Sequence, residues 1–244
     1  MDIKKMPLIK KGDDIAAVAL AAAKQQGLDF RDHDILVVAQ KIVSKAEGQI
    51  INLRTITPSK FAEKIAKSND KDPRHVEAIL NGTVRIVRMQ GAHLIVETRH
   101  GFVCANAGVD RSNVEDEDCV ITLPINPDES AHKIRERIRE LTGSNIGVII
   151  ADTFGRAWRI GQVNVAIGVD GLRPLIDYRG SGDMFGRTLN VTQIAIADEL
   201  ASAAELVMKK SDGTPVALIR GIEYAIGEGS ARQLIRPPGE DLFR

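Results

Sequence analysis

Residues 146–162, IGVIIADTFGRAWRIGQ, carry the most information about the fold and the chemistry of this chain. The first six of these residues form an apolar run that predicts a buried strand. The strand is expected to end at Asp152 and Thr153 and to open into a glycine-containing loop that carries Arg156 and Arg159. A carboxylate and a hydroxyl beside two guanidinium groups can hold a hard cation and the phosphates that accompany it. The stretch therefore indicates a functional site, although the acid could instead cap the next element while the arginines pair with surface acids.

The size and charge of the chain exclude several classes of protein. Its 244 residues suffice for one large domain or for two compact subdomains. Lys and Arg total 33, as do Asp and Glu, so no basic surface for nucleic acid or an acidic membrane is expected. Two cysteines, Cys104 and Cys119, do not make a disulfide framework. The N-terminal residues lack the apolar core of a signal peptide and no run is long enough to span a membrane, so we expect a cytoplasmic protein.

The remaining elements mix strands and helices without strict alternation. Helices are predicted at 14–27, 57–67, 72–80, 128–141 and 192–209, the last being the longest, with Asp128 as the cap of the fourth. Strands are predicted at 35–39, 83–89, 93–97, 102–105, 163–169 and 215–220, with the second and third as a hairpin. This order favours an α+β fold over a doubly wound parallel sheet.

The segment 40–48, QKIVSKAEG, places two lysines directly after a predicted strand. Lys41 and Lys45 are four residues apart and so share one face of a helix, where they repel unless an anion such as a triphosphate lies between them. Gln40 stands at the start of the same segment. The alternative is a pair of solvated surface lysines.

The segment 106–113, NAGVDRSN, has a glycine that suggests a tight turn. The turn would present Asp110 and Asn113 together, a combination suited to a divalent cation and to a nucleotide hydroxyl or base edge. The alternative is an Asx-turn in which both side chains bind their own backbone.

Two further segments are less specific. Residues 177–187, DYRGSGDMFGR, contain Arg179 among acids and glycines, which fits a clamp for a substrate carboxylate as well as an ion-paired loop. Lys209 and Lys210 follow the last predicted helix, where a helix dipole alone explains them, although they could also reach phosphates. No Walker-type phosphate loop and no metal-ligand spacing of histidines occurs in the sequence.

Long motifs in one order cover nearly the whole chain and resemble the coenzyme F-420-0 gamma-glutamyl ligase family. They are MPLI (6–9), QKIVSKAEG (40–48), ETRHGFVCANAGVDRSN (97–113), ADTFGRAWRIGQ (151–162), DYRG (177–180), ADELASAAELVMKK (197–210) and PVALIRG (215–221). Ala157 and Ile160 stand where that family more often has Pro and Asn.

The resemblance implies an α+β fold of two intertwined subdomains with mixed sheets and flanking helices, and a homodimer with its site near the subunit interface. It implies one gamma-glutamyl ligase unit over residues 1–244, which uses GTP to add L-glutamate to a deazaflavin precursor through gamma-linked amides. Mg²⁺ or Mn²⁺ is the expected metal, and K⁺ is a further candidate.

The resemblance also assigns residues to the site. The nucleotide would contact Met6, Pro7, Leu8, Ile9, Gln40, Lys41, Lys45, Asn113 and Lys209. Asp110 and Asp152 would hold one divalent ion, and Thr153 would help to hold a second ion near Lys209. Asp152 and Lys45 are the expected catalytic residues, and Arg156, Arg159 and Arg179 are the expected substrate-binding residues.

The residues support this chemistry on physical grounds, because a carboxylate becomes an acyl donor only once its oxygen is made a leaving group. Transfer of a phosphoryl group to it brings two anions together, and divalent ions and lysines would neutralise them. A metal-dependent phosphohydrolase could use the same residues on water. A non-catalytic deazaflavin- or nucleotide-binding module is the second alternative.

Overall fold

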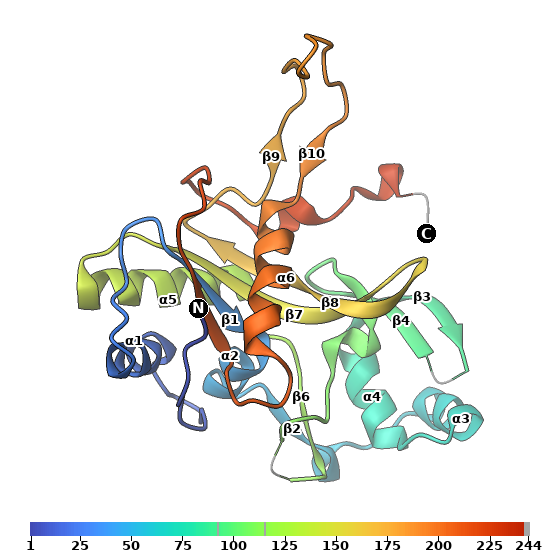
Figure 1. The fold of residues 1–244 in the computed structure, drawn as a ribbon. Coiled ribbons are helices and arrows are strands. Elements are labelled where there is room, and N and C mark those ends of the chain that lie inside the picture. Colours follow the sequence, from blue (N-terminus) through green and yellow to red (C-terminus); the bar gives the residue numbers. More distant parts are fainter. Residues whose placement is uncertain (92, 115, 242–244) are drawn as a thin grey trace.

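The computed structural model describes residues 1–91, 93–114 and 116–241 (Figure 1). Its largest sheet has the strand order β11–β1–β7–β8, formed by Val216–Ile219, Ile35–Ala39, Gly147–Arg156 and Arg159–Asp170. β1 and β7 run parallel, whereas the β1–β11 and β7–β8 pairs are antiparallel. A mixed sheet combined with helices confirms the α+β class.

The helices and the smaller strands complete the architecture. The α-helices are α1 Ile15–Gln25, α2 Gln40–Ala46, α3 Lys60–Asn69, α4 Pro73–Asn81, α5 Pro127–Thr142 and α6 Ile196–Met208. The other strands are β2 Ile50–Asn52, β3 Thr83–Gln90, β4 His93–Thr98, β5 Val103–Ala105, β6 Cys119–Ile121, β9 Ile176–Asp177 and β10 Gln193–Ile194. Short 3₁₀ turns occur at Leu53–Thr55, Asn106–Gly108, Ala231–Leu234 and Pro238–Glu240.

The larger hydrophobic core surrounds β1 and β7, whose Ile, Leu and Val side chains are buried. Ile149 and Ile150 have no exposed surface, as expected of central strands covered on both faces. α6 packs on β8 and β11, while α5 packs on β7 and β8 and also on α1. Figure 1 shows α6 crossing the sheet, with its C-terminal end close to the end of β11.

The predicted end of the β7 strand is wrong. The strand does not stop at Asp152 and Thr153 but continues to Arg156, where a tight turn leads into β8. Thr153 pairs with Asn164 across this hairpin. The apolar run ended the prediction because only the first half of β7 lies in the core. The second half continues by pairing with β8 and becomes exposed only at Gly155 and Arg156.

Two predicted helix features are also corrected. Asn126, not Asp128, caps α5, and the Asp128 carboxylate instead accepts backbone hydrogen bonds from Val169 and Ala231. α6 begins at Ile196 rather than at residue 192, because residues 193–194 pair with β9, so α5 with 16 residues exceeds α6 with 13.

A second, smaller group of buried side chains lies within residues 53–120. It is built from Leu53, Ala62, Ile65, Ala66, Val76, Ala78, Ile79, Leu94, Val96, Ala107, Val109 and Val120. α3 and α4 pack on each other, and α4 also packs on β3 of the predicted β3–β4 hairpin, which the structure confirms. This stretch is inserted between chain segments that belong to the larger core. The division into two intertwined subdomains stays a prediction.

A narrow arm projects from the body of the protein between β9 and β10 (Figure 1). It contains the glycine-rich segment 180–186 that was expected to be a loop. An isolated bridge joins Gly182 to Thr188, and the side chains of Met184, Phe185 and Val191 are 80–88% exposed.

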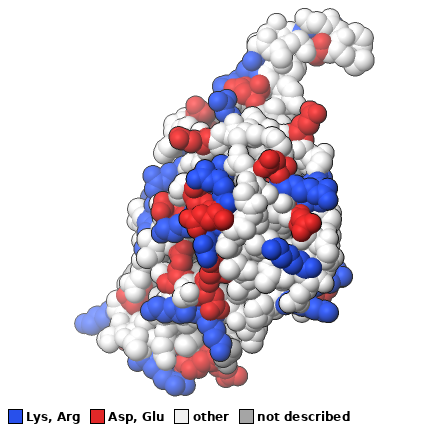
Figure 2. All heavy atoms as spheres, turned by 90° about the vertical axis from the view of Figure 1, so that its left-hand side faces the viewer, with Lys and Arg blue, Asp and Glu red and all other residues white. Residues whose placement is uncertain are grey.

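The surface carries both signs of charge side by side. On the face that carries α1 and α5, lysines and arginines alternate with acids (Figure 2), as the equal totals of 33 suggest. Within the described residues, no helix is long and apolar enough to cross a membrane.

The packing of α5 against β8 gives a stability prediction. A Cβ on Gly168 would lie 2.3 Å from the carbonyl oxygen of Pro127, which is backbone and cannot move aside cheaply. We expect Gly168→Ala to lower the free energy of unfolding by about 3 kcal/mol, measured by urea denaturation. Gly155→Ala in the same hairpin is the control, since its Cβ would meet nothing within 4 Å. Equal stability of the two variants would contradict the prediction.

Candidate active site

A cavity of about 290 Å³ lies where β1, β7 and β8 meet the N-terminal segment and the residues after α6. Four chain segments and two single residues, Asn113 and Asn164, supply its walls. These are Met6, Pro7, Leu8 and Ile9; Ala39, Gln40, Lys41, Ile42 and Lys45; Asn113; Ala151, Asp152, Thr153 and Asn164; and Met208, Lys209, Lys210, Ser211, Gly213, Thr214 and Pro215.

The strand β1 and helix α2 place the two lysines. Gln40 begins α2 directly after β1, so Lys41 and Lys45 lie one turn apart on the helix face that borders the cavity. The helical reading of segment 40–48 is therefore confirmed. Gln40 is 2% exposed and its side-chain oxygen accepts a hydrogen bond from Ser44 at 2.9 Å.

Asp110 lies next to Lys41, in the first turn of α2. The ammonium of Lys41 is 2.7 Å from Oδ2 of Asp110 and also donates to the hydroxyl of Ser112. The Asp110 carboxylate accepts the backbone amide of Ser112 at 2.8 Å and its hydroxyl at 2.9 Å, so the expected Asx-turn exists alongside the ion pair. Burial raises the pKa of Asp110, but the hydrogen bonds from Lys41 and Ser112 outweigh it and hold that pKa below its ordinary value.

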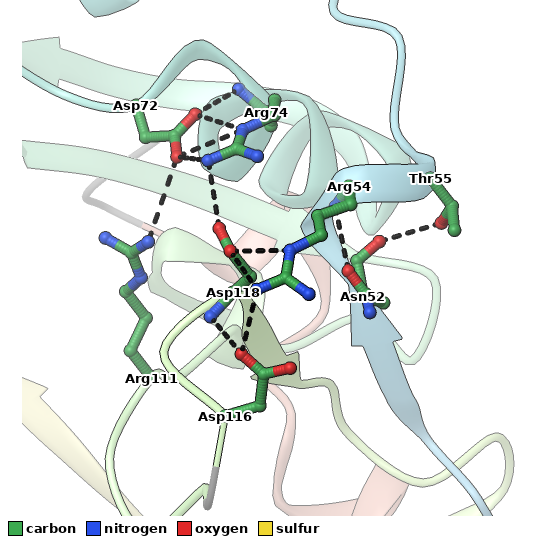
Figure 3. A network of polar contacts seen from close by, with 8 residues as sticks. All are labelled: Asn52, Arg54, Thr55, Asp72, Arg74, Arg111, Asp116 and Asp118. Carbon is green, nitrogen blue, oxygen red and sulfur yellow. Dashed lines mark hydrogen bonds and ion pairs between the residues drawn. The ribbon is translucent and has the colours of Figure 1, made fainter.

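A network of ion pairs supports the chain that follows Asp110 (Figure 3). Arg111 approaches Asp72 at 3.8 Å, and Asp72 also binds Arg74 at 2.7 Å. Arg74 reaches Asp118 at 3.1 Å. The network ties the residues after Asp110 to the start of α4, so it holds the turn in place.

A second arginine completes the network from the other side. Arg54, which follows β2, binds Asp118 at 2.8 Å and lies 3.8 Å from Asp116 (Figure 3). The hydrogen bond from Arg54 lowers the pKa of Asp118. Arg111 and Asp118 are thus both tied to charged groups at the start of α4 and after β2.

Asp152 is the most perturbed acid of the cavity. Burial raises the pKa of its carboxyl to about 6, and the backbone amide of Thr153 and the ammonium of Lys41 oppose that rise. The negative charge of Asp110 adds to the rise and the positive charge of Lys210 reduces it. The charges of Lys41, Lys210 and Asp110 therefore all act on Asp152.

The structure brings together most of the site residues that the sequence predicts. All nine residues expected at the nucleotide line the cavity, as do Asp152 and Thr153, and Asp110 adjoins it through Lys41. The roles assigned to these residues stay predictions.

The three arginines expected at the substrate lie outside the cavity wall. Arg156 and Arg159 pair across the exposed end of the β7–β8 hairpin, and Arg156 donates to the carbonyl of Ile160 at 2.9 Å. Arg179 lies on the β9–β10 arm and binds Asp177 through three side-chain hydrogen bonds. The ion-paired alternative for segment 177–187 therefore describes this structure.

Sequence reasoning missed Asn164 and considered Lys210 only as a possible phosphate ligand, without assigning it to the site. Asn164 is 5% exposed, and its side-chain oxygen accepts the hydroxyl of Thr153 at 2.7 Å. Lys210 donates to the same pair. Asn164 follows once the β7–β8 hairpin is recognised, because it is the cross-strand partner of Thr153. No pattern in the sequence indicates whether Lys209 or Lys210 contacts Thr153 and Asn164.

The oxygen-rich groups fit a divalent ion shared with a ligand. Among the described residues no cluster of three or more His, Cys, Asp or Glu side chains could hold a metal by itself. Mg²⁺ is ordinarily held by one or two carboxylates together with substrate phosphates and water. The charge of Asp110 acts on Asp152, and these two carboxylates would fit that ligand set.

Comparisons with known proteins agree with this chemistry. A family model described as F420-0:Gamma-glutamyl ligase matches residues 4–221. The chain is 48% identical over 245 aligned residues to the coenzyme F420:L-glutamate ligase of Methanothermobacter thermautotrophicus, covering 99% of this chain and 97% of the relative. It is 47% identical to the protein of that name from Methanocaldococcus jannaschii and 46% identical to that from Methanopyrus kandleri, covering 98% and 99% of this chain, and 94% and 97% of those relatives.

The class follows first: an α+β chain with this cavity and these full-length matches is a ligase. More particularly, it belongs to the F420-0:gamma-glutamyl ligase family, whose model covers most of the chain. The resemblance seen in the sequence motifs is thereby confirmed.

Proposed function

We propose that this chain adds L-glutamate to coenzyme F420-0 by gamma-linked amide formation, with GTP as the source of the phosphoryl group and an acyl phosphate as the intermediate. The observation that supports it best is the single cavity that gathers all nine expected nucleotide-binding residues beside Asp152 and Thr153. The family description supplies the acceptor F420-0, and the relatives' names supply the amino acid.

An unpaired donor in the cavity wall supports nucleotide binding. The side-chain nitrogen of Gln40 is buried and has no hydrogen-bond partner among the described residues. A buried donor without a partner is costly, and a ligand oxygen in the cavity would satisfy it. Apolar contacts from Met6, Leu8 and Ile42 complete the wall, as expected of a site that binds a flat ring and a charged tail.

The mechanism has two balanced steps. The substrate carboxylate attacks the gamma phosphorus of GTP, the bond to the beta-phosphate oxygen breaks, and GDP leaves. The amine of glutamate then attacks the acyl carbon, the carbon–oxygen bond to phosphate breaks, and the amine loses a proton to solvent. Lys41 and Lys45 hold the triphosphate and counter the charge that develops on it. Asp110 and Asp152 would hold a divalent ion, which would supply further positive charge at the phosphates. Asp152 is in this proposal a metal anchor rather than a general base.

Mass spectrometry tests the proposal. The protein is incubated with coenzyme F420-0, L-glutamate, GTP and Mn²⁺, and the product is expected to gain glutamyl units while GDP accumulates. GDP formation that is equally fast without glutamate would instead support a phosphohydrolase. Binding of the deazaflavin without phosphate release would support a non-catalytic module. Parallel reactions with ATP, with Mg²⁺ and with K⁺ test the proposed nucleotide and ions.

The proposed homodimer is supported by the exposed apolar arm. Met184, Phe185 and Val191 are almost fully exposed on a segment that projects from the body (Figure 1), and apolar side chains displayed in this way commonly pack against another surface. On this proposal Arg179, at the base of the arm, would serve a site near the subunit interface.

We expect the double variant Met184→Ser, Phe185→Ser to be monomeric at concentrations where the wild type is dimeric, measured by analytical ultracentrifugation. Met89→Ser serves as the control, since it removes an exposed apolar side chain from β3 instead of the arm. A double variant that remains dimeric would exclude the arm as the main contact.

A further inference from the structure

Lys210 contacts three oxygen-bearing side chains at the cavity. Its ammonium donates to the hydroxyl of Thr153 and, at 3.3 Å, to the side-chain oxygen of Asn164. It also lies 3.0 Å from a carboxylate oxygen of Glu205 on α6. Three oxygen ligands from β7, β8 and α6 therefore surround one positive charge.

The hydrogen-bond directions at Thr153 are fixed by its two partners. Its hydroxyl donates its single proton to Asn164 at 2.7 Å, so an oxygen lone pair is what receives Lys210. Asn164 is fixed in turn, because its backbone oxygen accepts the hydroxyl of Ser202 at 2.8 Å and its side chain is buried. The cluster is rigid and already holds a cation.

The neighbouring lysine is arranged differently. Lys209 ends α6 with φ of 54°, and its ammonium pairs with Asp212 at 3.0 Å, away from Thr153. The left-handed backbone at Lys209 therefore turns the chain so that the next residue, Lys210, supplies the charge to the Thr153–Asn164 pair.

We infer that the ammonium of Lys210 is a built-in cation of the cavity, which binds a phosphate of the ligand and occupies the position beside Thr153 where a second divalent ion would otherwise sit. The chain then needs one divalent ion, at Asp110 and Asp152, instead of the two that the sequence resemblance implies. Asp152 would lie between this ion and two ammonium groups, those of Lys41 and Lys210. The inference depends on the proposed function only for the identity of the phosphate ligand, GTP.

Counting bound Mn²⁺ tests the inference independently of ligation. Electron paramagnetic resonance of unbound Mn²⁺ is recorded during titration of the wild type, Lys210→Gln, Lys210→Arg and Lys209→Gln. We expect Lys210→Gln to bind one more Mn²⁺ per chain than the wild type, because it leaves the oxygens of Thr153, Asn164 and Glu205 without their cation. Lys210→Arg and Lys209→Gln should keep the wild-type number. An unchanged count in Lys210→Gln, or an equal gain in Lys209→Gln, would overturn the inference.

Nucleotide binding without metal is the second measurement. In EDTA, a fluorescent GTP analogue should bind Lys210→Gln at least about tenfold more weakly than the wild type, because a charged hydrogen bond is lost. Lys210→Arg should retain most of the affinity. Equal affinity in the Gln variant would contradict a phosphate-binding role. A wild type that forms no glutamyl product would reject the proposed function, whereas the Mn²⁺ count would still decide the role of Lys210.

Discussion

Replacement of Asp152 by Asn is expected to abolish both GDP formation and glutamate addition, with a loss of at least about 10³-fold in kcat. The substitution keeps the shape of the side chain but removes the charge that would anchor the divalent ion beside the phosphates. Both activities should disappear together, because phosphoryl transfer precedes amide formation in the proposed mechanism. Stopped assays for GDP and for glutamyl product measure the two steps separately.

Asp70→Asn is the matched control for this loss. Asp70 is an exposed acid that ends α3 in the left-handed region, a conformation that Asn also accepts. It lies at the end of a helix of the smaller core and does not line the cavity, so its variant should turn over normally. Near-normal turnover by Asp152→Asn at saturating Mn²⁺ would show that this acid is not a metal anchor.

Asp152→Asn should be more stable than the metal-free wild type at neutral pH. Burial raises the pKa of Asp152 to about 6, above its ordinary value of 3.8, so ionising the acid costs the folded state free energy. The cost is absent below pH 4, grows between pH 4 and 6, and is complete above pH 6. At pH 7.5 it amounts to up to about 3 kcal/mol, which the Asn variant avoids. Urea denaturation in EDTA at pH 4 and pH 7.5 measures the difference, and a wild type as stable as the variant at both values would contradict it.

The sequence predicted the fold class and the main strands because those rest on local patterns. The apolar runs of β1 and β11 and the hairpin of β3 and β4 lie where expected. The end of β7 could not be predicted, since the residues after Ala151 are held by pairing with β8 rather than by a hydrophobic pattern. Pairing between two polar strands of a hairpin leaves no hydrophobic periodicity in the sequence.

The candidate site shows the same division. Lys41 and Lys45 were recognisable from their spacing after a strand, and the helix α2 makes that spacing meaningful. That Asp110 meets Lys41 depends on contacts between residues far apart in the chain, which the motifs indicated only through the family resemblance. Lys209 was assigned to the site in preference to Lys210 because the sequence does not show that a single positive-φ residue at the end of α6 decides which of the two lysines contacts Thr153 and Asn164.

Replacement of Lys41 by Met should lower kcat/KM for GTP by about 10²–10³-fold, the loss typical of removing one charge-stabilising donor. Lys41 is the group that links the α2 face to Asp110, at 2.7 Å, and its charge also acts on Asp152. Without it the triphosphate loses a cation. The pKa of Asp110 should also rise, because the hydrogen bond from Lys41 is a main influence that holds it down. Steady-state kinetics and carboxyl NMR titration measure the two effects.

Lys133→Met is the matched control, since Lys133 is an exposed lysine of α5 that pairs with Glu129 at 3.5 Å and does not line the cavity. Its variant should keep the wild-type kcat/KM, as an exposed pair of this kind contributes little. Lys41→Arg should recover part of the activity, because the charge returns while the forked guanidinium cannot reproduce the contact of a single ammonium with both Asp110 and Ser112. If Lys41→Met resembled Lys133→Met in its kinetics, Lys41 would be a structural partner of Asp110 and the triphosphate would have to be held by Lys45 and the residues after α6.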